Sequence, residues 1–399
     1  MDQVRAQYEV YPYPERKPSD EKKRLVMGSP SMPAEIDHYL YAGKRDWREP
    51  MKVLFAGGGT GDGLIQFAAM MKAANRACEI TYVDLSTASR EIAEARAKIR
   101  EIDTIKFETG SLLDAPEYGQ FDYIDCCGVL HHLENPLDGF KALEHALAPE
   151  GGIGAMVYAP YGRVGVYALQ ETFNALYGDL PPDEKLKAAK KVYKNLPKQH
   201  AFKQNPHLVD HEQSDAGFYD LLLHSQDRAF DVIELCDVMD QAGLRLVSFL
   251  PPIRYDLSRF VESGGDELND IEKMAVAEKL DGGLKTHIFY AARSGEVKRE
   301  TVSKITPDLV PNLVGGSASQ VTTQIMRSGS LSITMGAEKS KLDVSPKEAP
   351  AISLIDGKRS LAEIAQILKL DPIGFNAIWG RVDRGLRPWG LLLYSGHTK

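Results

Sequence analysis

A glycine-rich turn between an apolar strand and a helix constrains the fold of this chain more than any other feature. The segment VLFAGGGTGDG places Gly57, Gly59 and Gly61 directly after a predicted strand at 53–56 and before a predicted helix at 62–72. Backbone can approach a ligand closely at such a turn because glycine has no Cβ. Taken alone, the turn could equally serve only to tighten a strand-to-helix corner.

The chain beyond the turn alternates between short apolar runs and helical patterns, which is typical of a parallel sheet. Further strands are predicted at 80–84, 105–108, 121–127, 153–159, 244–250 and 286–293. Helices are predicted between them at 87–102 and 136–148. The fold class is therefore α/β, with a doubly wound and mostly parallel sheet.

Changes in composition and in apolar pattern along the sequence divide the chain into four parts. We predict an N-terminal arm or lid (1–50), a main domain (51–295) with a helical insertion over the substrate side (164–240), a linker with short strands (296–344) and a small C-terminal domain (345–399). In the last part, Leu361, Ile364, Ala365 and Leu368 lie on one face of a helix that begins near Ser360, and a closing strand follows at 391–394. This pattern resembles a small winged-helix unit, a kind used for DNA, for peptides or for dimer contacts.

Polar residues at the ends of the predicted strands point to an adenosine-containing ligand. An acidic residue at the position of Asp84, which ends the second strand, reaches ribose hydroxyls in doubly wound sheets. Ser111 and Leu112 follow the third strand, where they can flank an adenine ring. These elements all lie at carboxyl ends of strands, and such ends converge on the crevice where these sheets bind ligands.

The first residue of the predicted helix after the glycine turn, Asp62, limits which cofactors can bind there. Asp62 occupies the place where a dinucleotide fingerprint has its third glycine. An acidic side chain caps a helix well there, but it would repel a pyrophosphate. S-adenosylmethionine has no phosphate and suits the turn better than a nicotinamide cofactor, which argues against an oxidoreductase.

Residues 1–295 resemble class I (Rossmann-like) S-adenosylmethionine-dependent methyltransferases, and most closely a bacterial subgroup with a YPYP N-terminal segment and an AGCGTG-type loop. The matching segments here read YPYP, AGGGTG, DLS, GVLHHLENP, YAPYGR and LLLHSQDRAF. The resemblance implies a seven-stranded sheet with an antiparallel hairpin at one edge. It also implies that Gly57, Gly59, Asp84, Ser111 and Gly128 contact the cofactor.

One position departs from the family pattern. Most class I enzymes carry an acidic residue two positions before the first glycine of the loop, and here that position is Phe55. The ammonium group of the cofactor must then find another partner, such as a backbone carbonyl. A cofactor-binding interaction or regulatory protein without turnover therefore stays as the alternative to an enzyme.

Methyl transfer is an in-line displacement, so the protein mainly aligns the nucleophile and excludes water. A base is needed only if the nucleophile arrives protonated. We predict His131, His224 and Tyr158 as catalytic residues, with His132 as an alternative base to His131. One of the adjacent histidines can instead pack under the loop, and His224 can act as a cap. Other polar groups expected near the pocket are Tyr161, Arg163 and Gln226, and Tyr11 and Tyr13 form either a lid or a surface arm.

Composition sets the remaining expectations. The net charge of −8 argues against general nucleic-acid binding. The cysteines (Cys78, Cys126, Cys127 and Cys236) lack metal-binding or disulfide spacing, so we expect no metal site. With no signal peptide and no membrane-spanning stretch in the sequence, we expect a cytoplasmic protein. The methyl acceptor is unknown and can be a small molecule, a peptide or a protein. Through its C-terminal domain the chain can recruit a macromolecular acceptor or form a homodimer.

Overall fold

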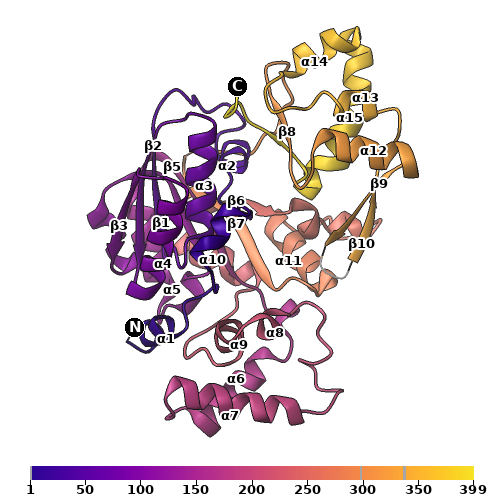
Figure 1. Cartoon of the computed structure of the whole chain (residues 1–399). Helices are drawn as coiled ribbons and strands as arrows, with labels where there is room; N and C mark the ends of the chain where they lie inside the picture. Colours follow the sequence, from indigo (N-terminus) through magenta and orange to yellow (C-terminus); the bar gives the residue numbers. More distant parts are fainter. Residues whose placement is uncertain (1, 297–298, 336–337) are drawn as a thin grey trace.

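A seven-stranded sheet forms the centre of the computed structural model, which describes residues 2–296, 299–335 and 338–399 (Figure 1). Its strand order is β3-β2-β1-β4-β5-β7-β6. The strands are β1 (Met51–Ala56), β2 (Cys78–Asp84), β3 (Ile105–Thr109), β4 (Phe121–Cys127), β5 (Leu147–Tyr158), β6 (Leu244–Leu250) and β7 (Thr286–Arg293). Only β7 runs antiparallel to its neighbours β5 and β6, and the other pairs are parallel. The mostly parallel seven-stranded sheet predicted from the sequence is confirmed.

Helices cover both faces of the sheet and bury two separate apolar clusters. One cluster joins the sheet to side chains of α5 (Pro136–His145), α10 (Val232–Gln241) and α11 (Asp270–Asp281). The other joins it to α2 (Pro33–Leu40), α3 (Asp62–Ala73) and α4 (Thr87–Ile99). Burial on both faces explains why the strands read as nearly continuous apolar runs. Helix α10 lies inside the range expected to be an insertion, but it packs on the sheet.

A small helical unit follows the fifth strand and has its own core. It consists of α6 (Val166–Tyr177), α7 (Pro182–Asn195), α8 (Asp210–Gln213) and α9 (Asp215–Leu222). Phe173, Phe202 and Phe218 are buried at its centre. Figure 1 shows this helical unit beneath the sheet, close to the N-terminal helix α1 (Asp2–Val10).

The N-terminal fifty residues form two parts that make different contacts with the main domain. Helix α1 and the short 3-10 helix Pro18–Lys22 run along the edge formed by the glycine turn and α4. By contrast, every residue of α2 is buried, because this helix packs against the sheet and α3. The range 1–50 is therefore part arm and part sheet cover.

The C-terminal part packs as one unit that starts well before residue 345. It contains β8 (Pro311–Leu313), α12 (Ala318–Ser328), β9 (Leu331–Met335), β10 (Glu338–Leu342), α13 (Ala349–Ile352), α14 (Leu361–Leu368), α15 (Pro372–Leu386) and β11 (Leu392–Tyr394). Ile325 and Leu342 share one apolar cluster with Ile352 and Trp379, and β11 pairs antiparallel with β8. The segment expected to be a linker thus supplies part of the core. The comparison with a winged helix stays a prediction.

The C-terminal unit docks on α2 through buried polar contacts. The Tyr394 backbone N–H donates to Nδ1 of His38 at 3.0 Å, and the Ser395 hydroxyl donates to Oδ2 of Asp37 at 2.7 Å. Leu393 adds an apolar contact to the cluster beneath α2. Within the described ranges, no helix combines the length and the apolar character needed to cross a bilayer.

Candidate active site

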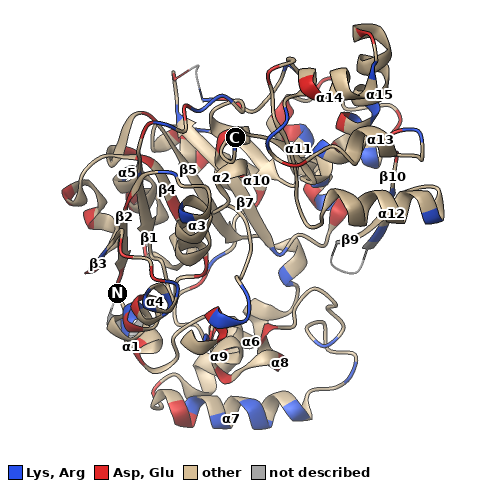
Figure 2. Cartoon of the chain, turned by 45° about the horizontal axis from the view of Figure 1, so that its top comes forward, with Lys and Arg blue, Asp and Glu red and all other residues tan. Residues whose placement is uncertain are grey.

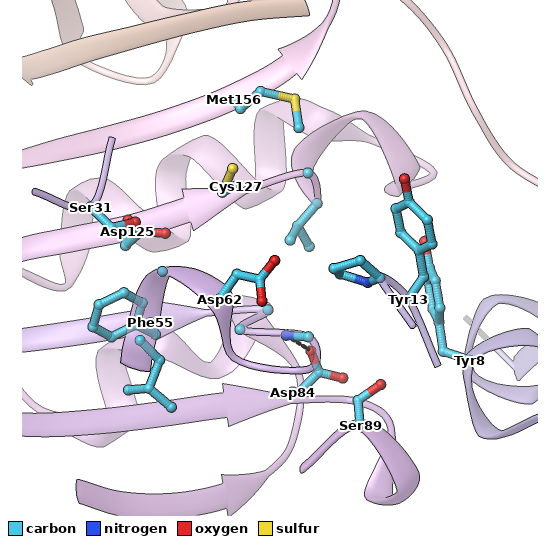
Figure 3. Close-up of a pocket in the computed structure, with 18 of the residues that line it drawn as sticks. Tyr8, Tyr13, Ser31, Phe55, Asp62, Asp84, Ser89, Asp125, Cys127 and Met156 are labelled. Carbon is cyan, nitrogen blue, oxygen red and sulfur yellow. Dashed lines mark hydrogen bonds between the residues drawn. The ribbon is translucent and has the colours of Figure 1, made fainter. Parts of the chain in front are cut away.

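A cavity of about 430 Å³ opens at the carboxyl ends of the parallel strands (Figure 3). The glycine turn, the ends of β2, β4 and β5, the N-terminal arm and α9 contribute to its lining. Parallel strands end at one edge of a sheet, and the crevice there is the usual ligand site of such folds.

The glycine turn adopts a backbone conformation that other residues rarely take. Gly57 and Gly59 have positive φ angles of +73° and +53°. A Cβ on Gly57 would come within 2.4 Å of the Val129 side chain, so the turn passes too close to the next loop for any larger residue. Gly61, with φ of +94°, does not line the cavity; a Cβ there would meet Ala93 of α4 at 3.0 Å. Gly61 therefore serves the packing of α3 on α4.

Asp84 ties the glycine turn to the second strand. One carboxylate oxygen accepts from the Gly59 N–H at 2.8 Å, drawn as a dashed line in Figure 3, and the other accepts from the Ser86 N–H at 2.8 Å. Each oxygen retains a further lone pair for a ligand hydroxyl. Burial raises the pKa of this carboxyl group. Of the other predicted cofactor residues, Ser111, Leu112 and Gly128 line the same cavity.

Asp62 binds two arginines instead of capping its helix. The helix cap is Gly61, without a side-chain hydrogen bond, while the Asp62 carboxylate pairs with Arg16 at 2.6 Å and with Arg96 at 2.7 Å. Burial alone would raise the pKa of Asp62, but the hydrogen bond and charge of Arg16 hold it below its usual range. Because Arg16 belongs to the arm, this pair fastens the arm over the glycine turn. The Thr60 hydroxyl adds a bond to the Pro14 carbonyl at 2.8 Å.

The acidic residue missing at Phe55 has a counterpart on the adjacent strand. Phe55 is buried against Phe67, and its register partner across the β1–β4 pair is Asp125. Asp125 lines the cavity, and its Oδ2 accepts from the Ser31 hydroxyl at 2.7 Å. Its Oδ1 has no hydrogen-bond partner among the described residues. Burial raises the pKa of Asp125 to about 7.

A buried carboxylate joins two tyrosines at the outer end of the cavity. Tyr8 donates to Oδ1 of Asp220 at 2.9 Å, and Tyr158 donates to Oδ2 at 3.1 Å. All three residues line the cavity, together with Tyr13. In Figure 3, Tyr8 and Tyr13 lie side by side, on the side opposite Phe55 and Asp125. Tyr11 lies outside the lining and stacks on Tyr219, with ring centroids 5.0 Å apart.

Three histidines meet beside Tyr158. His131 is fully buried and has no hydrogen-bond partner on either ring nitrogen among the described residues. Its ring contacts that of Tyr158, with centroids 3.8 Å apart and planes tilted by 31°. His224 stacks on His132 at 3.8 Å, and its Nε2 lies 3.3 Å from the Tyr8 hydroxyl. Burial lowers the pKa of both His131 and His224 well below the usual value. Of the three, only His132 lines the cavity.

Arg163 supports the Tyr158 ring from the side of the helical unit. Its guanidinium carbon lies 3.6 Å from the centre of that ring, and its Nη2 makes a buried ion pair with Asp227 at 2.9 Å. The desolvated pair holds Tyr158 and α6 in place; it does not reach the cavity. Tyr161 and Gln226, also expected near the pocket, do not line it.

The residues His132, Asp220 and His224 lie close enough to be considered as metal ligands, with one donor atom of each within 4.8 Å of the others. The Gln226 backbone N–H donates to Nδ1 of His224 at 3.1 Å. A neutral His224 then carries its proton on Nε2, where no lone pair is left for a metal. The geometry favours a hydrogen-bonded cluster over a metal centre.

Comparison with known proteins agrees with this architecture. Residues 54–153 match the family model described as a methyltransferase domain. The structure of PKMT2 from Rickettsia typhi in complex with AdoHcy superimposes with a TM-score of 0.62 at 14% sequence identity, covering 92% of this chain and 75% of that chain. The chain therefore contains a methyltransferase domain and has the class I methyltransferase fold. Enzymes of this class use S-adenosylmethionine, the cofactor predicted from the sequence.

A second structure of the same protein and one further relative are also similar to this chain. A second structure of PKMT2 from Rickettsia typhi gives the same TM-score of 0.62 at 14% identity, covering 91% of this chain and 75% of that one. An uncharacterized protein from Synechococcus sp. is 28% identical over 308 residues, which are 73% of the methyltransferase and 71% of the relative.

Several residues of the methyltransferase site carried no clear signal in its sequence. Tyr8, Asp125 and Asp220 all line the cavity, and none was singled out. Asp125 and Asp220 do share one trait, because each is a lone acidic residue within an apolar run, in YIDCC and FYDLLL. A buried charge is costly unless it is paired or functional, so that trait was the available signal.

Proposed function

We propose that this methyltransferase transfers a methyl group from S-adenosylmethionine to an acceptor that enters beside Tyr8, Tyr158 and Asp220. The observation that carries the proposal is the continuity of one cavity from the glycine turn and Asp84 to these three residues. A single cavity with a nucleoside-binding end and a polar aromatic end suits a cofactor and an acceptor in contact.

The strand order supports one orientation of the cofactor. Strands β2 and β3 lie on one side of β1, and β4 and β5 lie on the other. Asp84 would accept the ribose hydroxyls, and Ser111 with Leu112 would border the adenine. The methyl-bearing end of the cofactor would then lie near Gly128 and the end of β5, which line the cavity next to its acceptor end.

Asp125 is the proposed partner of the cofactor's ammonium group. Its free Oδ1 borders the cavity at the level of the glycine turn, and Ser31 holds the other oxygen. Asp62 is less suited because Arg16 and Arg96 already neutralise it. The carboxylate that family members carry on β1 would thus be supplied by β4.

The residues around the methyl group exclude water and hold the acceptor. Tyr13 and Tyr8 of the arm close one side of the cavity, and Asp220 of α9 closes another. The lone pair of the acceptor attacks the methyl carbon in line with the carbon–sulfur bond, so alignment and desolvation supply most of the acceleration.

The charge of the helical unit favours a macromolecular or peptide acceptor with acidic segments. Figure 2 shows lysine residues, in blue, along α7. Lys187, Lys191 and Lys194 are exposed and spaced by four and three residues, which places them on one face of the helix, and the exposed Lys198 follows. On a chain of net charge −8, this lysine face is a local region of opposite sign.

The test is a labelling experiment with the full chain, S-adenosyl-L-[methyl-14C]methionine and bacterial extract. We expect label in macromolecules, and much less of it when Asp84→Ala replaces the native chain. The Lys187→Glu/Lys191→Glu/Lys194→Glu variant should lower the labelling and weaken its dependence on salt. Cofactor binding without any label transfer would instead support the non-catalytic alternative.

A further inference from the structure

We infer that His132 is the proton acceptor of the transfer reaction and receives the proton of the methyl acceptor at Nε2. The assignment rests on the proposed function and concerns an acceptor whose nucleophilic oxygen, nitrogen or sulfur arrives with a proton. It follows from the hydrogen bonds of the His132 and His224 rings, and from the lack of any such bond at the His131 ring within the described part of the chain.

Only His132 presents an open ring nitrogen to the cavity. Both nitrogens of His131 are sealed from solvent without partners in the described part of the chain. Both nitrogens of His224 are engaged, Nδ1 by the Gln226 N–H at 3.1 Å and Nε2 by the Tyr8 hydroxyl at 3.3 Å. Nε2 of His132 has no partner among the described residues and is not sealed, and its residue lines the cavity.

The tautomer of His132 is set by a backbone carbonyl. Its Nδ1 lies 2.9 Å from the Gln226 oxygen. A carbonyl oxygen only accepts hydrogen bonds, so Nδ1 carries the proton of the neutral ring and Nε2 carries the lone pair. His132 is therefore oriented to take a proton on the side that faces the cavity.

One residue gives the two stacked rings opposite tautomers. The Gln226 carbonyl oxygen accepts from Nδ1 of His132, while the Gln226 N–H donates to Nδ1 of His224. His224 then holds its proton on Nε2, toward Tyr8, which in turn donates to Asp220. His224 is a positioning residue because it has no lone pair to offer the acceptor.

The surroundings stabilise the positive charge that the transfer creates on His132. A carboxylate oxygen of Asp220 lies within 4.8 Å of a ring nitrogen of His132. Arg163 is the nearby cation, and its charge is balanced by Asp227. The titratable or charged groups that face His132 from the elements around it are Tyr8, His131, Tyr158, Arg163, Asp220 and His224.

The step balances without another reactant. The acceptor lone pair forms the new bond to the methyl carbon, and the carbon–sulfur bond breaks with its electron pair on sulfur, which yields S-adenosylhomocysteine. The proton of the acceptor passes to Nε2 of His132, and the bonding pair stays on the acceptor atom. Imidazolium then returns the proton to solvent.

The first test is independent of any acceptor. In protein labelled with 15N-histidine, long-range 1H–15N spectra report which nitrogen of each neutral ring is protonated. We expect the signals lost in His132→Gln to be those of an Nδ1–H ring, and the signals lost in His224→Gln to be those of an Nε2–H ring. An Nε2–H ring at His132 would overturn the assignment.

The second test measures turnover with simple probe nucleophiles: butylamine, phenol and 2-mercaptoethanol, each with labelled S-adenosylmethionine. Positioned bases contribute about 10²–10⁴-fold. His132→Gln should therefore lower transfer to the probe that the native chain uses by at least about a hundredfold. Calorimetry should show cofactor affinity within about threefold of the native value. His145→Gln, at an exposed position on α5, is the matched control.

The outcomes separate the two proposals. Transfer that persists in His132→Gln at the native rate overturns the role of His132 and leaves the proposed function intact. A native chain that binds the cofactor but labels neither the probes nor the extract overturns the proposed function, and the role of His132 with it.

Discussion

Phe55 and Asp125 are register partners on neighbouring strands, so an acidic side chain borders the glycine turn although the usual strand does not provide it. The aromatic ring on β1 packs into the core against Phe67, and the carboxylate on β4 faces the cavity. The family motif places an acidic residue on β1, and this chain lacks it there. An acidic residue is nevertheless present at the same level of the sheet, on the adjacent strand β4.

Asp125→Asn should weaken S-adenosylmethionine binding at pH 8 by about tenfold or more, because hydrogen bonds to charged groups contribute roughly 1.5–3 kcal/mol. Burial raises the pKa of Asp125 to about 7, so the free protein protonates this group below neutrality while the bound ammonium needs it ionised. Native affinity should accordingly fall as the pH drops from 8 to 6, and the variant should lose this dependence. Calorimetry over that range is the measurement, with Glu134→Gln, an exposed position, as control.

Asp84→Ala should weaken cofactor binding at least tenfold for a different reason. The carboxylate both faces the predicted ribose site and holds the Gly59 and Ser86 N–H groups, so its loss also loosens the turn. We expect a lower melting temperature as well. Glu79→Gln on the same strand, where the side chain is 71% exposed, should change neither property. Unaltered affinity in folded Asp84→Ala would show that the ribose lies elsewhere.

Arg16→Ala should free the arm from the glycine turn. The lost bidentate pair with Asp62 is partly exposed, so we expect only a small change in the free energy of unfolding. Hydrogen exchange in 2–28 should accelerate, and bound cofactor should dissociate several-fold faster. Lys17→Ala, next to it but exposed, serves as the comparison. Equal exchange in the two variants would mean that the other bonds of the arm, such as those of Thr60 to the Pro14 carbonyl and of the Thr87 N–H to Glu9, are enough to hold it.

Two truncations should behave differently. A chain ending at residue 295 keeps the whole sheet and every residue that lines the cavity, so its cofactor affinity should stay within about twofold of native. It should melt at a lower temperature because Asp37 and His38 lose partners. Deletion of 345–399 alone strips Ile325 and Leu342 of their buried neighbours, and light scattering should show aggregation. A soluble, monodisperse product of this second deletion would contradict the shared core.

The strands were predictable where the apolar pattern is local. The predicted ranges for β4, β6 and β7 coincide with the observed ones, because each is a compact apolar run between polar breaks. The prediction for β5 starts at 153, but the strand begins at Leu147, since Leu147 already pairs with Phe121 of β4 before a register irregularity that precedes Gly152. Such an extension depends on the neighbouring strand and not on the residues themselves.

The cofactor end of the site was predictable for the same reason, and the acceptor end was not. Gly57, Gly59 and Asp84 lie within thirty residues of one another and follow a known spacing. The bond from Tyr8 to Asp220 joins residues 212 positions apart, and no periodicity signals such a contact. His131 and His132 are adjacent in the sequence, and they are distinguished by features that only the folded chain has: the Gln226 carbonyl at Nδ1 of His132 and the cavity that His132 lines.

The contact between α2 and the C-terminal strand has a consequence for how the chain matures on the ribosome. Asp37 and His38 leave the exit tunnel early, yet their partners Ser395 and Tyr394 lie more than 350 residues further along. Until those residues emerge, a helix that covers the central sheet carries buried groups without their final partners. A nascent methyltransferase domain can thus fold early, but it reaches its full resistance to unfolding and proteolysis only when the late segment docks. A chain that ends before that segment leaves Asp37 and His38, near its N-terminus, without these partners.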